Sequence, residues 1–232
     1  MEERPTYIDI HAHVNFRAFD ADRADVIARS LDSGVWMIHI GTQQDTSRKA
    51  VEMTKEFPVG VYAIIGLHPV HANESFHDKE EIGEGGEEFT SRAELFDKDF
   101  YRNLAKEGGK KVVGIGECGL DYYRMPSVEE RKRQKDAFIA QIELAIELDL
   151  PLMLHIRSGV GGNAYREVLD ILKTYKHAHG DVLRGDAHFF AGTVDDAKEF
   201  LALGFHLSYT GVITFARQYK ELIEVTPIDR IM

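Results

Sequence analysis

The segment Asp9-Ile10-His11-Ala12-His13 holds the first residues whose types and spacing could do chemistry. It ends an apolar run that begins at Tyr7. If this run is a β-strand, alternate side chains share a face, and the two imidazoles lie side by side. Neutral imidazole is a common ligand for zinc and similar ions, but two histidines need further ligands to complete a coordination shell. Taken alone, His-x-His favours a plainer interpretation, two histidines on a half-exposed strand.

Further candidate ligands follow other apolar runs. His68, Glu117, His155 and His188 each stand at the end of a predicted strand. In a barrel of eight parallel strands, the active site lies at the carboxyl ends of the strands. Five strands would then bring a histidine or a glutamate to one rim, which favours a metal site over a set of separately packed core residues.

The elements that must position these residues alternate along the chain. Short runs rich in valine, isoleucine and leucine are separated by segments with helical spacing, which predicts strand-helix units and a parallel sheet. Strands are expected over residues 7–13, 35–40, 62–68, 112–117, 152–156, 183–188 and 205–209, and helices over 21–33, 44–57, 99–107, 128–148, 165–177 and 194–203. The strands lack polar alternation, as expected for strands covered on both faces. Ser127 and Glu130 form a capping box before the longest helix.

The composition fits one globular domain over residues 1–232, with an acidic loop insertion at about 74–97. The net charge of −11 argues against non-specific coating of nucleic acid, which depends on lysine and arginine. Bound divalent cations can still hold a phosphate in an acidic protein. The first residues lack a signal-peptide core and no apolar run could cross a membrane, so we expect a cytoplasmic protein. The one cysteine, Cys118, excludes an internal disulfide.

Five motifs, in order along the chain, resemble those of the TatD-like metal-dependent hydrolases, a branch of the amidohydrolase superfamily. They are Asp9-Ile10-His11-Ala12-His13, Gly66-Leu67-His68-Pro69, Gly116-Glu117-Cys118-Gly119-Leu120-Asp121, His155-Ile156-Arg157 and His188-Phe189-Phe190-Ala191-Gly192. The resemblance runs from Tyr7 to the last residue. It implies an α/β fold of the TIM (β/α)8-barrel type, a divalent metal centre that often holds two ions, and hydrolysis, frequently of phosphodiester bonds in DNA.

The resemblance also implies a ligand set. His11 and His13 are expected to bind one ion and His155 and His188 the other. Glu117 is expected to bridge the two ions through its two oxygens. Two divalent ions held close together, whether zinc, magnesium or manganese, can share and activate a water and neutralise charge on a phosphate.

Two more residues are expected to act beside the ions. His68 would contact the substrate or support a ligand. Arg157 would either grip a phosphate with its fork of donors or form an ion pair with a carboxylate such as Asp121. The second His-x-His, His177-Ala178-His179, lies at a predicted helix end, where histidine suits the helix dipole, and is not expected to bind metal. Cys118 is interpreted as a core residue, and His39 and His206 as residues that either pack within their strands or support a ligand.

The family pattern continues past the last residues of this sequence. The resemblance implies that a segment like Pro227–Met232 leads into an eighth strand with a Glu-Thr-Asp-type motif, whose aspartate binds metal and acts as general base. Asp229 precedes that strand and is too early to replace it. A barrel with its eighth strand cut off would expose unpaired edges. We therefore expect a sequence that is part of a longer protein or a further polypeptide segment that completes the barrel; the third explanation is a true truncation.

The favoured hypothesis is a divalent-metal-dependent deoxyribonuclease that cleaves phosphodiester bonds with a metal-activated water. An ester or amide hydrolase, such as an aminoacyl-tRNA deacylase, would use the same water and stays open as an alternative. A hypothesis of another class is a catalytically impaired metal-binding protein. The expected partner is DNA or another phosphodiester substrate, and we expect no association with a membrane.

Overall fold

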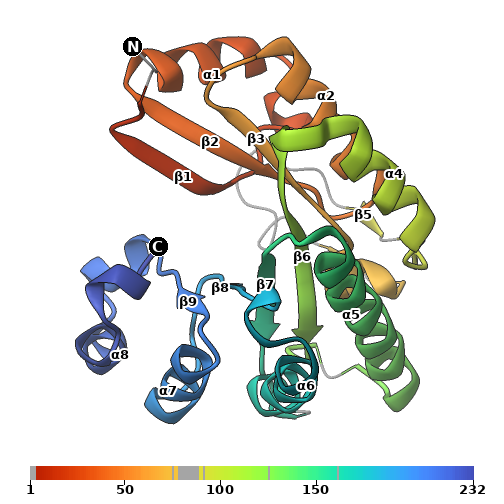
Figure 1. Cartoon of the computed structure of the whole chain (residues 1–232), viewed down its shortest axis with the longest axis vertical. Helices are drawn as coiled ribbons and strands as arrows, with labels where there is room; N and C mark the ends of the chain where they lie inside the picture. The colour runs from red at the N-terminus through yellow and green to blue at the C-terminus, as the bar shows by residue number, and fades with distance from the viewer. Residues whose placement is uncertain (1–3, 75, 78–88, 91, 125, 161) are drawn as a thin grey trace. The chain divides into compact units, whose positions relative to one another are not determined.

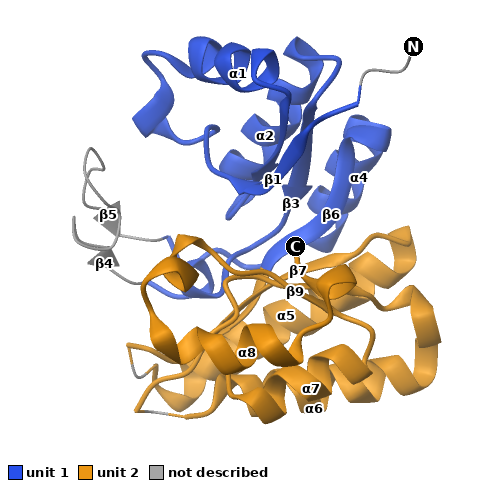
Figure 2. Ribbon diagram, turned by 90° about the vertical axis from the view of Figure 1, so that its left-hand side faces the viewer, with its two compact units in different colours: residues 1–117 blue, residues 118–232 orange. Residues whose placement is uncertain are grey.

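The computed structural model describes residues 4–74, 76–77, 89–90, 92–124, 126–160 and 162–232. The chain forms two compact units, Met1–Glu117 and Cys118–Met232 (Figure 2). Each unit alternates strands with helices, as the sequence predicts, and each is an α/β structure (Figure 1).

The first unit is built on parallel strands. Its strands are β1 (Tyr7–Ala12), β2 (Val35–Ile40), β3 (Val61–Ile65) and the first part of β6 (Val112–Asp121), paired in that order. All three pairings are parallel. The helices between them are α1 (Arg23–Asp32), α2 (Gln44–Glu56) and α4 (Lys98–Gly108). A core of buried apolar side chains, which includes Ile27, Met37 and Met53, fastens α1 and α2 to the sheet.

The second unit continues the same pattern. The end of β6 is followed by β7 (Leu152–Arg157), β8 (Gly185–Ala187) and β9 (His206–Leu207), with β7–β8 and β8–β9 in parallel register. The helices are α5 (Val128–Leu148), α6 (Ala164–His179), α7 (Val194–Ala202) and α8 (Lys220–Val225). Phe200 packs edge to face with Tyr165, Phe190 and Phe205, and these rings join α6 and α7 to the strands.

Seven strands lie where the sequence predicts them. The ends of β6 and β3 differ from the predicted ends, and both differences affect where site residues lie. The prediction that β6 ends at Glu117 is wrong, because the strand runs on to Asp121. The Gln134 side chain of α5 supports this extension: it accepts from the Asp121 N–H at 2.9 Å and donates to the Asp121 carbonyl at 3.0 Å. Strand β3 ends earlier than predicted, at Ile65, so His68 lies in the loop that follows.

Local signals at helix ends are confirmed. The Ser127–Glu130 capping box starts α5, which spans the predicted residues. Gly34 and Gly204, just past the ends of α1 and α7, have φ angles of 73° and 83°, the left-handed conformation that favours glycine. Among the helices in the described part of the chain, none has both the length and the apolar character needed to cross a membrane.

Two further segments bear on the predictions. Most of the expected acidic insertion, residues 74–97, lies outside the described residues; its described parts include a short antiparallel pair, β4 (Phe76–His77) and β5 (Phe89–Thr90). Near the other end, Ile231 forms a parallel bridge with Leu207, and the Met232 N–H donates to the Leu207 carbonyl at 3.1 Å. Ile231 and Met232 thus lie beside β9, where the sequence predicts the approach to an eighth strand.

Candidate metal centre

The end of β1 brings two imidazoles together. The Nε2 atoms of His11 and His13 lie 3.1 Å apart, with the rings at 81° to each other. The segment after β1 is fastened by the Asn15 side-chain amide, which donates to the Ile40 carbonyl at 3.0 Å and to the Thr46 carbonyl at 3.2 Å. These bonds tie the end of β1 to β2 and α2, so the histidine pair is held by the fold of the first unit.

His13 is a neutral imidazole at neutral pH. Its pKa is lowered from 6.5 to about 4, first by burial and then by the neighbouring His11, while Glu117 and the Ile40 carbonyl oppose the shift. Burial disfavours the charged form because the protein interior solvates it poorly. A neutral ring keeps one nitrogen lone pair, which is what a metal ion requires of a histidine ligand.

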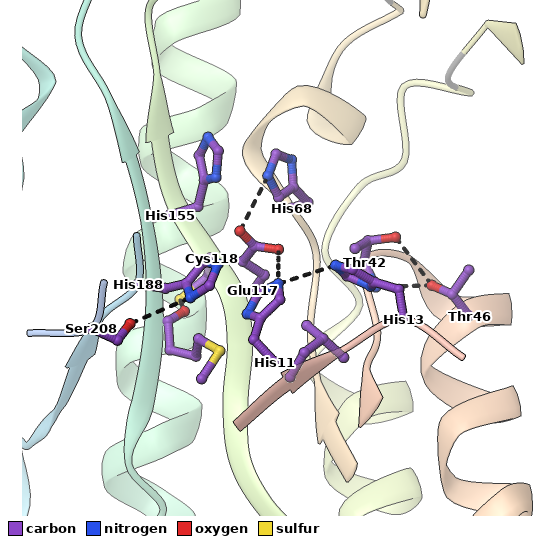
Figure 3. A network of polar contacts seen from close by, with 12 residues as sticks. His11, His13, Thr42, Thr46, His68, Glu117, Cys118, His155, His188 and Ser208 are labelled. Carbon is purple, nitrogen blue, oxygen red and sulfur yellow. Dashed lines mark hydrogen bonds and ion pairs between the residues drawn. The ribbon is translucent and has the colours of Figure 1, made fainter. Parts of the chain in front are cut away.

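Glu117 completes the group in the first unit. Its side chain is buried, with 7 % exposed, and its backbone N–H donates to the Gly41 carbonyl at 3.3 Å. Its Oε2 lies 3.4 Å from His11 Nε2, and its Oε1 lies 3.7 Å from His68 Nε2 (Figure 3). Figure 3 shows His11 and His68 directed at the same carboxylate, which therefore faces imidazole nitrogens with both of its oxygens.

The donor atoms fit a small divalent cation. Bonds of about 2.0–2.1 Å to nitrogen and oxygen place neighbouring ligand atoms about 3.3 Å apart in a tetrahedral site and about 2.9 Å apart in an octahedral one. The separations of 3.1 Å between the two histidine nitrogens and 3.4 Å between His11 and Glu117 fall at or near this range. His11 and Glu117 are also among the residues whose donor atoms could hold an ion.

His68 faces Glu117 with a hydrogen rather than a lone pair. The Val70 N–H donates to His68 Nδ1 at 3.3 Å, so Nδ1 is unprotonated. A neutral imidazole then carries its hydrogen on Nε2, the atom nearest Glu117. This tautomer suits a donor to a carboxylate or another anion, and the role of His68 beside the ions stays a prediction.

In the second unit, His155 is paired with Asp121. His155 Nε2 lies 2.8 Å from Asp121 Oδ2, and the other carboxylate oxygen accepts from the Tyr123 N–H at 2.9 Å. The strands come close here: a Cβ on Gly119 would lie 2.0 Å from the His155 carbonyl oxygen. Only glycine fits this position, which also has a φ angle of 144°. The His155–Asp121 pair therefore depends on Gly119 as well as on Gln134.

Arg157 has a different neighbour from the one considered in the sequence. Asp121 pairs with His155, whereas the Arg157 guanidinium lies over the Tyr123 ring, 3.6 Å from its centroid. Arg157 is exposed. Its charge is thus held on an aromatic face at the end of β7, where it can meet an anionic ligand.

His188 belongs to a chain of hydrogen bonds that begins at its partly buried ring and ends at the buried Asp186. Ser208 Oγ donates its single hydrogen to Asp186 Oδ2 at 2.7 Å. The same Oγ lies 3.4 Å from His188 Nδ1 (Figure 3). Because that hydroxyl hydrogen is already used, Ser208 can only accept from His188. His188 then carries its hydrogen on Nδ1 and keeps the lone pair on Nε2. A hydrogen-bonded partner of this kind fixes the tautomer and raises the basicity of a histidine ligand.

Removing this hydroxyl should weaken metal binding. We expect Ser208→Ala to lower the affinity of the protein for zinc or manganese by about 10-fold, because Nδ1 of His188 loses its acceptor. Calorimetric titration of the metal-free protein measures the affinity, and nitrogen-15 NMR of the imidazoles measures the share of the Nδ1–H tautomer. Ser208→Thr should restore both. Thr174→Ala, which removes an exposed hydroxyl bonded to Asp170 in α6, is the control. An unchanged tautomer and affinity in Ser208→Ala would contradict the role.

Two histidines lie at the helix end where the sequence predicts them, and one further histidine and the cysteine are packed as predicted. His177 and His179 are in the last turn of α6, and Tyr175 stacks on His179. His39 is fully buried in β2, which lowers its pKa to about 4. Cys118 is buried, with Sγ 3.7 Å from the Met153 carbonyl. The sequence gives no role to Ser208, Asp186 or Gln134, because nothing in the sequence around these residues sets them apart.

The comparisons with known proteins place the chain as a whole among proteins of one family. The family model described as TatD related DNase matches residues 8–232. The uncharacterized metal-dependent hydrolase YabD of Bacillus subtilis is 32 % identical over 97 % of this chain and 77 % of its own length. A protein named 3'-5' ssDNA/RNA exonuclease TatD, from Cronobacter sakazakii, is 34 % identical over 97 % of this chain and 75 % of its own length.

Solved structures show the same fold. The TatD homologue YJJV of Escherichia coli K12 superposes with a TM-score of 0.74 at 23 % identity, over 97 % of this chain and 77 % of its own. A TatD family hydrolase of Entamoeba histolytica gives 0.73 at 20 % identity, over 99 % of this chain and 73 % of its own. These likenesses confirm the α/β fold of the TIM-barrel type. The chain therefore belongs to the family of TatD-related DNases, and it is a metal-dependent hydrolase.

Proposed function

We propose that this hydrolase holds two divalent ions and cleaves phosphodiester bonds of DNA. One observation carries the proposal: His11 Nε2 lies at ligand spacing from two other donors, 3.1 Å from His13 Nε2 and 3.4 Å from the buried carboxylate of Glu117. Divalent ions bound there would activate a water for attack and neutralise charge on the phosphate. The names of relatives such as the Cronobacter sakazakii exonuclease support a nucleic acid as substrate.

The residues divide between the two units. His11 and His13 with Glu117 would hold one ion. His155 and His188 would hold the second, as the resemblance of the sequence motifs implies. The bridge through Glu117 stays a prediction, as do the single domain, the further polypeptide segment and the cytoplasmic location. Mixed nitrogen and oxygen donors suit zinc, manganese or magnesium.

Two cationic or hydrogen-donating groups would act on the substrate. His68 presents its Nε2 hydrogen toward the Glu117 carboxylate, which orients Glu117 and offers a donor to a phosphate oxygen. Arg157 would bind a phosphate oxygen through its planar fork of donors. Neither group needs to change its protonation state to do so.

The proposal is tested with three substrates: a single-stranded oligodeoxynucleotide, a carboxylic ester and an aminoacyl-tRNA. We expect cleavage of the oligonucleotide, dependent on added divalent metal and abolished by EDTA.

Arg157→Ala should raise KM for the oligonucleotide by about 10-fold or more, because a charge-assisted hydrogen bond to phosphate is lost. Arg166→Ala removes an exposed arginine that pairs with Glu199 and is the control. Hydrolysis of the ester or the aminoacyl bond alone would contradict the proposal and favour the deacylase. No hydrolysis with metal bound would favour a catalytically impaired metal-binding protein.

A further inference from the structure

Two exposed aromatic residues of the second unit lie close in sequence to its candidate site residues. Tyr123 is 55 % exposed and follows Asp121 by two positions, at the end of β6. Phe189 is 43 % exposed and directly follows His188, just after β8. Strands β6 and β8 both neighbour β7, which ends at Arg157. The carboxyl ends of three adjacent strands thus carry two exposed rings and the exposed cation of Arg157.

Phe189 adopts a conformation that its own packing does not explain. Its φ angle is 45°, in the left-handed region that is unfavourable for a bulky side chain. The backbone is fixed on both sides, because the His188 N–H donates to the Leu154 carbonyl at 3.0 Å and the Phe190 N–H donates to the Ser208 carbonyl at 2.9 Å. Phe190 is fully buried, whereas Phe189 keeps 43 % of its surface exposed and its ring lies 6.4 Å, centroid to centroid, from that of His188. Strained residues of this kind cluster at ligand sites.

Tyr123 carries a cation on one face. The Arg157 guanidinium lies 3.6 Å from the centroid of the Tyr123 ring, close enough for the two planar groups to stack. This contact keeps the charge of Arg157 beside an exposed ring. Exposed rings next to arginine are the means by which proteins hold single-stranded nucleic acids, because every base offers a face for stacking and every linkage a phosphate.

We propose that Tyr123, Arg157 and Phe189 form a stacking surface that holds the bases of a single-stranded nucleic acid at the site. The inference rests on the proposed function and adds the residues that select the form of the substrate. Two strand spacings, about 10 Å, separate the ends of β6 and β8, so the two rings hold different bases of one strand. Paired bases in a duplex are stacked on each other and do not offer these faces, so the surface favours single strands over duplexes.

The test compares variants of Phe189 that separate the ring from the backbone strain. Phe189→Gly and Phe189→Ala both remove the ring, and each is expected to raise the Kd for a fluorescein-labelled oligothymidylate by about 5- to 100-fold. Only glycine relieves the positive φ angle, so Phe189→Gly alone should also raise Tm, by about 2–4 °C. Fluorescence anisotropy in EDTA, which prevents cleavage, measures binding. If the strained Phe189 serves to bind the nucleic acid, Phe189→Gly should be more stable than wild type and should bind the oligothymidylate more weakly.

Variants of Tyr123 give a second test of the stacking surface. Tyr123→Phe should bind the oligonucleotide as wild type does, whereas Tyr123→Ala should bind it more weakly by about 5-fold or more. A duplex hairpin of the same length should show little difference between variants. Tyr175→Ala, which removes a ring from the last turns of α6, is the matched control.

The outcomes distinguish this proposal from the function on which it rests. Wild-type protein that binds and cuts the oligonucleotide, together with unchanged binding in Phe189→Gly and Tyr123→Ala, would overturn the stacking surface alone. Wild-type protein that neither binds nor cuts single strands with metal present would overturn the proposed function as well. Equal loss of single-strand and duplex binding in the variants would also count against the stacking surface.

Discussion

Glu117→Gln is expected to lower the rate of oligonucleotide hydrolysis by at least about 1,000-fold. Glutamine has nearly the shape of glutamate, so the buried position is filled and the fold should stay intact. The substitution removes the negative charge that faces His11 and His68 and replaces one oxygen with an amide nitrogen. The loss should therefore appear in kcat, measured by single-turnover cleavage at saturating metal, with thermal unfolding as the check on folding.

Glu107→Gln is the matched control for this variant. Glu107 lies in the same unit and pairs with Lys55 at the surface, 2.6 Å from Nζ. A surface ion pair contributes little to stability and none of this chemistry, so activity should stay at the wild-type level. If nuclease activity survived in Glu117→Gln undiminished, the observed cleavage would come from a contaminant or from another centre.

The second large expected effect is a loss of metal binding that occurs at one of the two His-x-His pairs in the sequence and not at the other. His11→Gln and His13→Gln should each weaken metal binding by about 100-fold or more, and cleavage at limiting metal should fall in parallel. Each variant removes one of two nitrogens that lie 3.1 Å apart, and the nitrogen of His11 lies 3.4 Å from the Glu117 carboxylate. Competition with a metal-chelating dye measures the affinity.

His177→Gln and His179→Gln are the controls, because they change the other His-x-His. These residues end α6, and glutamine there leaves the helix intact, so metal affinity and activity should not change. Equal losses at both pairs would show that metal binding does not depend on the geometry at the end of β1.

Periodicity and local chemistry were enough to predict much of the fold. Apolar runs with strong β-propensity marked the strands, and Ser127 with Glu130 marked the start of α5 to the residue. The side-by-side arrangement of His11 and His13 follows from the two-residue period of a strand. These features depend on residues that are close to one another in the sequence, so they can be predicted from the sequence alone.

Other parts of the site depend on contacts between distant segments. Strand β6 runs past Glu117 because Gln134 of α5 supports Asp121, and no pattern within the strand indicates this. The tautomer of His188 depends on the one hydrogen of Ser208, a residue that looks like any other at the end of a strand. Burial sets the pKa of His13, and burial is known only once the segments have packed.

The metal content of the purified chain tests the central claim most directly. Elemental analysis of protein of verified intact mass, loaded with zinc or manganese and then desalted, should find about two ions per wild-type chain. The same preparation of Glu117→Gln should retain about one or fewer. Wild-type protein with only traces of metal, or a Glu117→Gln variant that holds as much metal as wild type, would contradict a centre built on His11, His13 and Glu117.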